Sequence, residues 1–386
     1  MTEQIDSGLR IVIIGAGLIG PRHAQSVQRH PLTDLLAFVD PSPSAIPIAE
    51  SFSVPCYASL AELFHSGDTK AKPDAAIVAT PNHTHVDVTI QLLESGIRNI
   101  LLEKPISDDL DSAERLLATL KAYENAKSNI LIGHHRRFNP YVRTTKTLLT
   151  TNSLGTIIAV NGLWTLLKPP SYFASPLGSW RADKKKGGVL GINLIHDIDV
   201  LQFLFGPISR VYAESTTPQR QSQNPEHTAE EGCAVTLRFK CGIVGTFLIC
   251  DVTPSPLNFE MGTGENPTIP PVHGSASDCY RVFGTRGSLS VPDMTRWSYD
   301  HVSEVGEGGE NEKGWNQELG VQRVSVEGGD ERPFDRQWEY FIDLLRGKEV
   351  DGEAGCSVED GVRALRVVRA VRESMQGGRP VEVQVA

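Results

Sequence analysis

Residues 11 to 20 read Ile11-Val12-Ile13-Ile14-Gly15-Ala16-Gly17-Leu18-Ile19-Gly20. The first four residues form an unbroken β-branched run, which is typical of a strand buried on both faces. The three glycines that follow fit a tight turn opening a helix, because glycine permits both a sharp bend and a close approach of the backbone. The stretch therefore predicts a strand, a turn and a helix, the opening of an alternating α/β fold.

A second apolar run, residues 35–39, ends at Asp40, 20 residues after Gly20. A glycine turn followed by an acidic residue at this spacing is the fingerprint of a dinucleotide site. The helix N-terminus binds the pyrophosphate and the carboxylate accepts hydrogen bonds from the adenine ribose. A carboxylate repels a 2′-phosphate, and no arginine follows Asp40 closely. We therefore predict NAD rather than NADP as the cofactor.

Composition narrows the class of protein further. The chain has 386 residues, enough for two domains at about 100–200 residues each. Its net charge of −10 disfavours nucleic acid and anionic membranes as partners. No apolar segment is long enough for a signal peptide or a membrane span, and the six cysteines form no C-x-x-C pair. These features predict a cytoplasmic protein with reduced, mostly structural cysteines.

Two patterns of expected elements divide the chain. Strands alternate with helices through residue 133, which predicts a doubly wound parallel sheet and an NAD-binding Rossmann domain over residues 1–133. Later strands follow one another largely without helices, which predicts an α+β domain with a large, mostly antiparallel open sheet over residues 134–386. These later strands are expected at residues 156–166, 210–214, 233–239, 243–251, 280–283, 288–291 and 321–326.

Three more strand ends carry polar residues. They are the loop Thr80-Pro81-Asn82-His83-Thr84-His85, the tripeptide Glu103-Lys104-Pro105 and the run from Gly133 to Asn139. The carboxyl ends of parallel strands share one edge of a sheet, and ligands bind at that edge. Together with the glycine turn, these motifs place a candidate cofactor site there.

These residues resemble the Gfo/Idh/MocA family, named for glucose–fructose oxidoreductase, inositol dehydrogenase and rhizopine catabolism. Glu103-Lys104-Pro105 is the most specific of the motifs, and the resemblance spans nearly the whole chain. It implies an enzyme that moves a hydride between NAD and a secondary hydroxyl of a cyclic polyol, sugar or sugar acid. It also implies a homodimer or homotetramer that uses the open sheet face.

A candidate catalytic helix follows Gly187 and Gly188. Residues 194, 198 and 201 mark a buried face, while Asn193 and His196 lie within one turn on a neighbouring face. In the resembled family this helix carries a histidine that exchanges the substrate's hydroxyl proton, and His196 matches it. Many members have an Asp four residues earlier, where this chain has Ile192. Without that carboxylate, the tuning of His196 as a base is left open.

Oxidation of an alcohol by NAD requires a general base poised near neutral pH. We predict Lys104 and His196 as the catalytic pair, in a cleft between the domains. Predicted cofactor contacts are Gly15, Gly17, Leu18, Ile19, Gly20, Asp40, Thr80, Pro81, Asn82, His85, Glu103, Lys104 and Arg137. Predicted substrate contacts are Lys104, Arg136, Trp180, Arg181, Asn193 and His196.

Alternatives to these roles stay open. His196 also suits a core position, and Trp164, Tyr172 and Phe173 suit either a sugar-stacking wall or the core. Lys184 to Lys186 suit a solvated loop, although an acidic sugar becomes attractive if they face the pocket. The histidines at 83, 85, 134 and 135 lack partners at metal-ligand spacing, so we predict no metal. At the level of function, the alternatives are a glycosidase that oxidises its substrate transiently and a non-catalytic NAD-binding regulator.

Overall fold

The computed structural model describes residues 8–65, 72–122, 128–174, 178–272, 278–302, 313–329 and 331–385. It divides into two compact units. Unit 1 comprises Met1–His135 and Phe334–Leu365, and unit 2 comprises Arg136–Pro333 and Arg366–Ala386. The expected boundary at residue 133 lies two residues from the first break, but residues 334–365 join unit 1 and not the second domain as expected.

Unit 1 is built on a parallel sheet, as the sequence predicts. The six strands have the order β3-β2-β1-β4-β5-β6, with β1 at the point where the order reverses. The strands are β1 (Leu9–Ile14), β2 (Thr33–Val39), β3 (Cys56–Tyr57), β4 (Ala75–Val78), β5 (Asn99–Leu102) and β6 (Asn129–Ile132). The helices are α1 (Gly20–Arg29), α2 (Ala45–Ser51), α3 (Leu60–His65), α4 (His85–Glu94), α5 (Leu110–Ala122) and α10 (Pro333–Leu345).

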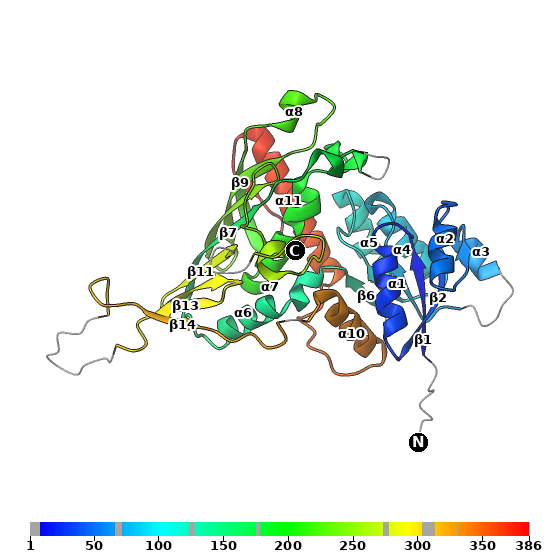
Figure 1. The fold of residues 1–386 in the computed structure, drawn as a ribbon, viewed down its shortest axis with the longest axis horizontal. Helices are drawn as coiled ribbons and strands as arrows, with labels where there is room; N and C mark the ends of the chain where they lie inside the picture. Colours follow the sequence, from blue (N-terminus) through cyan, green and yellow to red (C-terminus); the bar gives the residue numbers. More distant parts are fainter. Residues whose placement is uncertain are drawn as a thin grey trace, which may run out of the picture. The chain divides into compact units, whose positions relative to one another are not determined.

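The central strand of unit 1 is buried on both faces. Ile11 and Ile13 belong to a core cluster that also takes residues from α1 and α10, whereas the intervening side chains point to the opposite face because a strand alternates. From α10 this cluster takes Trp338, Phe341 and Ile342, and Asp335 accepts a hydrogen bond from Ser26 of α1 at 3.0 Å. These contacts explain why residues 334–345 cluster with unit 1; Figure 1 shows α10 beside α1.

Unit 2 is built on a nine-stranded mixed sheet of order β14-β13-β12-β11-β7-β10-β9-β8-β15. β7 and β10 run parallel, and the other described pairs are antiparallel. The strands are β7 (Ile157–Thr165), β8 (Ile208–Ser215), β9 (Gly232–Phe239), β10 (Val244–Cys250), β11 (Tyr280–Gly284), β12 (Gly287–Val291), β13 (Thr295–Ser298), β14 (Gly320–Arg323) and β15 (Val381–Glu382). This confirms the predicted mostly antiparallel sheet.

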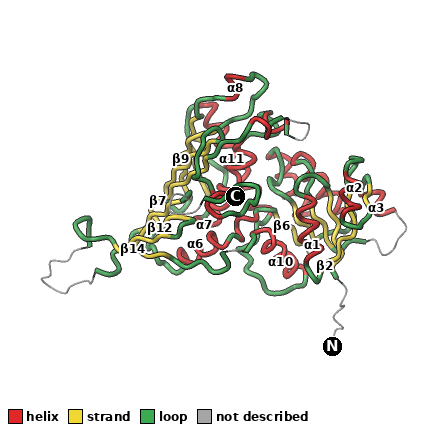
Figure 2. The backbone as a smooth tube through the Cα atoms, viewed as in Figure 1, coloured by secondary structure: helices red, strands yellow, loops and turns green. Residues whose placement is uncertain are grey.

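Helices cover one face of this sheet and leave apolar side chains on the other. The helices with residues in unit 2 are α6 (Pro140–Thr150), α7 (Ile195–Phe205), α8 (Arg220–Gln223), α9 (Phe259–Thr263) and α11 (Val358–Gly377), whose first residues belong to unit 1. Val142 of α6 and Leu201 of α7 line one apolar gap with Val282 of β11. The register places exposed apolar residues from three strands on this other face, namely Val244, Leu248, Phe283 and Val321. Figure 2 shows the strands as one continuous layer.

Three elements of unit 2 escape the sequence patterns. β13 and β15 are short, and α9 lies inside a stretch rich in proline and glycine, which carries no helix signal. Helix α9 starts where the side chain of Asn258 accepts a hydrogen bond from Met261 N–H at 2.9 Å. The strand expected at 321–326 is shorter and corresponds to β14.

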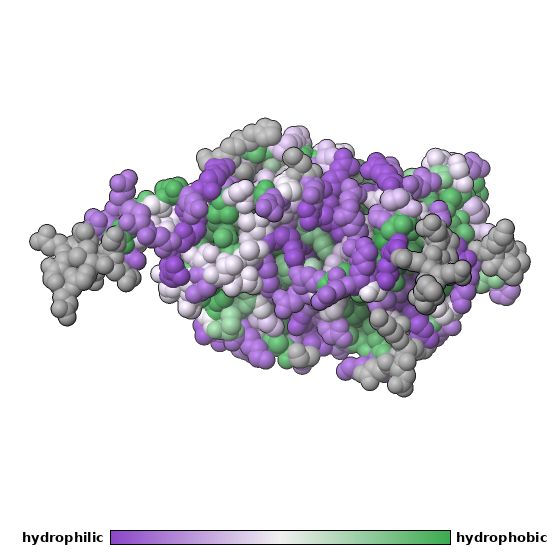
Figure 3. Space-filling view, turned by 90° about the horizontal axis from the view of Figure 1, so that it is seen from below, coloured by the Kyte–Doolittle hydropathy of each residue, from purple (hydrophilic) through white to green (hydrophobic). Residues whose placement is uncertain are grey.

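No helix among the described residues combines the length and hydropathy needed to cross a membrane. On the face drawn in Figure 3, hydrophilic residues cover much of the surface and hydrophobic ones lie in smaller groups between them.

Gly162 provides a test of the packing in unit 2. It pairs with Phe247 across β7 and β10, and a Cβ at residue 162 would overlap the buried Phe247 ring. We expect Gly162→Ala to destabilise the protein by about 1–3 kcal/mol through overpacking. Gly245→Ala is the matched control, because its Cβ would lie 3.3 Å from Val160 O and requires only a small adjustment. Urea unfolding midpoints measure both, and equal midpoints would contradict the packing argument.

Candidate functional site

The turn between β1 and α1 needs glycine at two positions. Gly15 has φ +99°, and a Cβ there would lie 2.5 Å from Ala79 O. A Cβ on Gly20 would overlap Gly15 O, whereas Gly17 has no heavy atom within 4 Å of its Cβ position. The helix begins without a side-chain cap, so its first N–H groups face outward in the arrangement that binds phosphates. Gly17 is therefore the position at which a ligand can approach the backbone.

Asp40 is held beside this turn. Ala16 N–H donates to its Oδ2 and Ser42 N–H donates to its Oδ1, both at 2.8 Å. Each carboxylate oxygen accepts more than one hydrogen bond, so Asp40 retains acceptor capacity for two hydroxyls. Leu18, in the same turn, is 82% exposed. The structure thus brings together the glycines and the carboxylate that the fingerprint requires.

His85 has a place that its sequence context did not indicate. The side chain is 1% exposed, with Nε2 2.8 Å from Thr80 O and Nδ1 2.8 Å from Pro105 O. Burial lowers the pKa of His85, although the two carbonyls oppose that shift. The imidazole therefore connects the loop after β4 with the loop after β5. Asn82 and Pro81 lie on the outside of the same loop.

Glu103 is a buried charge at the end of β5. Its Oε1 lies 2.7 Å from His23 Nε2, and its Oε2 accepts a hydrogen bond from Lys104 N–H. Burial by itself would raise the pKa of Glu103, but the hydrogen bond from His23 and the charges of His23, Lys104 and His135 bring it to about 2. Gly133 leaves room for this carboxylate, since a Cβ there would lie 3.1 Å from it. Lys104, half-buried, follows at the sheet edge.

The candidate catalytic helix of unit 2 starts with a wide turn. Residues Leu190–Leu194 form a π-helical turn that runs directly into α7. Such turns shift the phase of the helix and recur at functional sites. Leu194, Ile198 and Leu201 are buried as expected, and His196 is 7% exposed. Asn193 is half-buried and accepts a hydrogen bond from Lys168 Nζ at 2.7 Å.

Arg136 is the centre of a buried ion-pair network. Its guanidinium contacts Asp197 at 3.2 Å, Glu260 at 2.6 Å and Glu265 at 2.8 Å. Burial and the neighbouring carboxylates raise the pKa of Asp197 to about 7, against the opposing charge of Arg136 and a hydrogen bond from Tyr280. These contacts organise unit 2, so Arg136 is left out of the ligand-binding set that we propose below.

Arg137 also forms a buried ion pair. It is 4% exposed, and its Nε and Nη2 donate to both oxygens of Asp199, with a shortest distance of 2.6 Å. The guanidinium also lies over the Phe203 ring. Asp197 and Asp199 are thus ion-pair partners of these two arginines. Like Arg136, Arg137 is left out of the proposed set.

Trp180 and Arg181 lie in a short 3-10 turn, Ser179–Ala182. The Arg181 guanidinium lies 4.6 Å from the centroid of the Tyr172 ring and 4.8 Å from that of Trp180. Lys168, which the sequence analysis missed, lies 4.8 Å from the same Tyr172 ring. Its position directly before Pro169 and Pro170 carries no motif, so only the fold reveals it.

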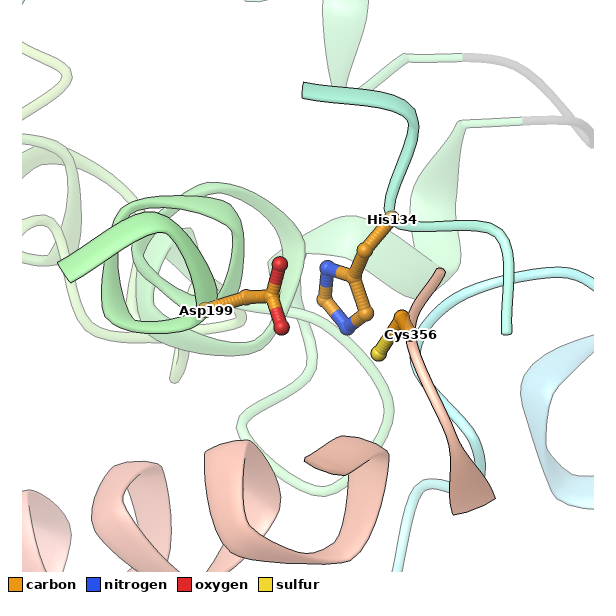
Figure 4. Close-up of side chains that lie close together, drawn as sticks. All are labelled: His134, Asp199 and Cys356. Carbon is orange, nitrogen blue, oxygen red and sulfur yellow. The ribbon is translucent and has the colours of Figure 1, made fainter. Parts of the chain in front are cut away.

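Two features invited other interpretations. In unit 1 the ligand atoms of His134 and Cys356 lie within 4.8 Å of each other (Figure 4). Two donors fall short of the three or four protein ligands of a zinc site, and Asp199, also drawn there, belongs to unit 2 and pairs with Arg137. Lys184 and Lys185 are exposed and line a hollow of about 410 Å³ in unit 2.

Comparison with known proteins identifies the family. A family model described as "Oxidoreductase family, NAD-binding Rossmann fold" matches residues 9–129. A second, "Oxidoreductase family, C-terminal alpha/beta domain", matches residues 146–383. The chain belongs to the Gfo/Idh/MocA oxidoreductase family. The resemblance stated from the motifs is thereby confirmed, together with the NAD-binding domain.

Relatives within the Gfo/Idh/MocA family include an inositol 2-dehydrogenase of Rhizobium meliloti, 30% identical over 52% of this chain and 57% of that protein. The chain thus spans little more than half the length of this relative. An uncharacterized oxidoreductase, YrbE of Bacillus subtilis, is 25% identical over 100% of this chain and 98% of its own length. A solved myo-inositol dehydrogenase of Corynebacterium glutamicum has the same fold, with TM-score 0.69, 23% identity and coverage of 98% and 100%.

The charge on Glu103 gives a prediction with a defined pH range. Because the folded-state pKa of about 2 lies below the ordinary 4.5, Glu103 stabilises the fold above about pH 4.5, and this stabilisation is lost as pH falls toward 2. The shift corresponds to about 3 kcal/mol at neutral pH. We expect Glu103→Gln to lower stability at pH 7, and the gap to the wild type to shrink below pH 4.5.

Urea unfolding of both proteins between pH 3 and pH 7 measures this gap. Glu94→Gln, at an exposed position of α4, is the control and should leave stability unchanged. A gap for Glu103→Gln that is independent of pH would show that the carboxylate contributes no charge interaction.

Proposed function

We propose that the chain is an NAD-dependent dehydrogenase that oxidises a secondary hydroxyl of a cyclic polyol, sugar or sugar acid to the ketone or lactone. The observation that carries the proposal is the β1–α1 turn, where Gly17 is open to a ligand and Asp40 is held beside it by Ala16 N–H. The inositol 2-dehydrogenase among the relatives supports the substrate class.

In this proposal the glycine turn and the α1 N-terminus bind the pyrophosphate of NAD, and Asp40 accepts hydrogen bonds from the adenine ribose. Thr80, Pro81 and Asn82 line the cofactor from the next loop, while His85 and Glu103 hold that loop and the Lys104 backbone in place. Bound NAD would accept the hydride at its nicotinamide ring.

Lys104 and His196 handle the substrate's proton in the proposed reaction. Lys104 donates a hydrogen bond to the oxygen whose charge changes, and His196 removes the hydroxyl proton as general base. Asn193, one turn before His196, orients the substrate together with Trp180 and Arg181. Family membership with Lys104 and His196 both present favours an active enzyme over a regulator without turnover.

Incubation with NAD and a panel of inositols, aldoses and aldonic acids tests the function. Steady NADH formation with at least one compound is the expected result. Binding of NAD without turnover would favour the regulator, and release of sugar from a glycoside without net NADH would favour the glycosidase.

We further propose that the chain is cytoplasmic and forms a homodimer or homotetramer through the open face of the unit 2 sheet. The exposed side chains of Val244, Leu248 and Phe283, which share one face by their register with β7, support an apolar contact on that face. Light scattering gives the oligomer size.

Asp40 should control the choice of cofactor. Asp40→Ala removes the acceptor for the ribose hydroxyls and the charge that repels a 2′-phosphate, so NAD should bind about tenfold more weakly and the preference over NADP should narrow. Fluorescence titration with NADH and NADPH measures both affinities. Asp34→Ala, an exposed position on the same strand β2, is the control. An unaltered ratio of the two affinities would remove Asp40 from cofactor selection.

Substitutions of the two proposed catalytic residues, Lys104 and His196, should have non-additive effects on kcat. Lys104→Ala and His196→Ala should each lower kcat by about 10²–10⁴, with little change in NAD affinity. If both serve one proton transfer, the double variant should be little slower than the slower single variant. His196→Ala should also flatten the acidic limb of the pH–rate profile.

Stopped-flow detection of NADH gives these rates, and Lys121→Ala, exposed on α5, is the control. Strictly multiplicative losses in the double variant would mean that the two residues act in separate steps.

A further inference from the structure

Lys168 and Arg220 share one buried carboxylate in unit 2. Asp251, at 1% exposure, lies 3.4 Å from Lys168 Nζ and 2.7 Å from Arg220 Nη2. The backbone sets this arrangement, because Lys168 N–H donates to Asp251 O and Leu167 forms a β-bridge with Val252. Lys168 and Arg220 thus face the same carboxylate, while Glu231, also buried, accepts the backbone N–H of Arg220.

The charge of Lys168 is desolvated. Lys168 is 8% exposed, and burial lowers its pKa to about 8 even though Asp251 opposes the shift. Burial and the Arg220 charge lower the pKa of the neighbouring His227, although Glu231 and Asp251 oppose the shift. In a site of low dielectric, a second anion would interact strongly with Lys168.

Two buried nitrogen atoms next to Asp251 and Phe173 also make no hydrogen bond to the described residues. Arg220 Nη1 and His227 Nε2 are buried and have no hydrogen-bond partner among the described residues. An ammonium has three N–H donors, and Lys168 uses two of them, on Asn193 and Asp251. Buried polar atoms of this kind are normally paired, which points to a ligand that supplies acceptors.

Aromatic rings border the same cluster. The Arg220 guanidinium lies 4.3 Å from the Phe173 centroid, and His227 packs edge-on to Phe173 at 4.9 Å. Tyr172 packs edge-on to Phe173 at 5.1 Å and is contacted by Lys168 and Arg181. Apolar walls with a few convergent donors are the usual make-up of a small-ligand site.

We propose that Lys168 and Arg220 form a subsite for an anionic group, a carboxylate or a phosphate, on the sugar substrate. The subsite joins the proposed substrate site through Asn193, which accepts a hydrogen bond from Lys168 and lies three residues before His196. The inference rests on the proposed function in one respect, namely that Asn193 contacts the substrate. It narrows the substrate to sugars or cyclitols that carry acid groups.

Calorimetric titration of the NAD-saturated protein tests the subsite with three probes, D-glucuronate, D-glucose 6-phosphate and D-glucose. At least one anionic sugar should bind about tenfold or more tightly than glucose, since charge-assisted hydrogen bonds are strong. The two anionic arms distinguish a carboxylate from a phosphate. Equal binding of all three sugars would overturn the proposal.

Variants separate this role from a structural one. Lys168→Met should reduce the affinity for the anionic sugar to about that of the same variant for glucose, while Lys168→Arg should retain part of the preference. Arg220→Lys keeps the charge beside Asp251 but removes Nη1, so it should weaken the anionic sugar alone and serves if Lys168→Met fails to fold. Lys240→Met, exposed in a hairpin turn, is the control. An undiminished anionic preference in Lys168→Met or Arg220→Lys would refute the subsite.

NADH formation with the same sugars separates the two proposals. Oxidation of glucose without any preference for the anionic sugars would overturn the subsite and leave the dehydrogenase function intact. Binding of an anionic sugar that depends on Lys168, with no NADH from any sugar in the panel, would support the subsite and count against the dehydrogenase function.

Discussion

The β1–α1 turn depends on a steric constraint, the lack of space for a side chain at Gly15 and Gly20. Gly20 packs against the carbonyl of Gly15, and Gly15 packs against Ala79. These contacts bring the end of β1 against the end of β4, where the Thr80 loop begins. The same compact turn allows Ala16 N–H to reach Asp40, so one packing requirement positions both the anion-binding backbone and the ribose acceptor.

Buried charge is used differently in the two units. In unit 1, Glu103 has one close partner, His23, and its negative charge is strongly stabilised. In unit 2, Arg136 forms ion pairs with three carboxylates. The pKa of one of them, Asp197, is raised to about 7, so this carboxylate takes up a proton more readily than an exposed one. The first arrangement holds a strand end, and the second joins α7, α9 and the segment before α6.

Much of this could be predicted from the sequence where the signal is local. Apolar runs and glycine spacing predicted the parallel sheet, the cofactor turn and Asp40, because each depends on residues close together in the chain. The partners of buried charges could not be predicted in this way. His23 and Glu103 are 80 residues apart, Arg136 and Glu265 are 129 apart, and Lys168 meets Asp251 only through the pairing of β7 with β10. A sequence pattern does not show which distant residues come into contact. The roles of His85, Arg136 and Arg137 therefore rest on motifs in the sequence and not on their contacts in the fold.

The place of α10 in unit 1 bears on how the protein is made. Trp338, Phe341 and Ile342 belong to the same core cluster as Ile11 and Ile13, yet they are translated more than 300 residues later. A ribosome will therefore have released most of unit 2 before the hydrophobic face of the Rossmann sheet can be covered. Until then part of that face stays uncovered on the nascent polypeptide, so unit 1, although its synthesis begins first, cannot complete its core until α10 has been made.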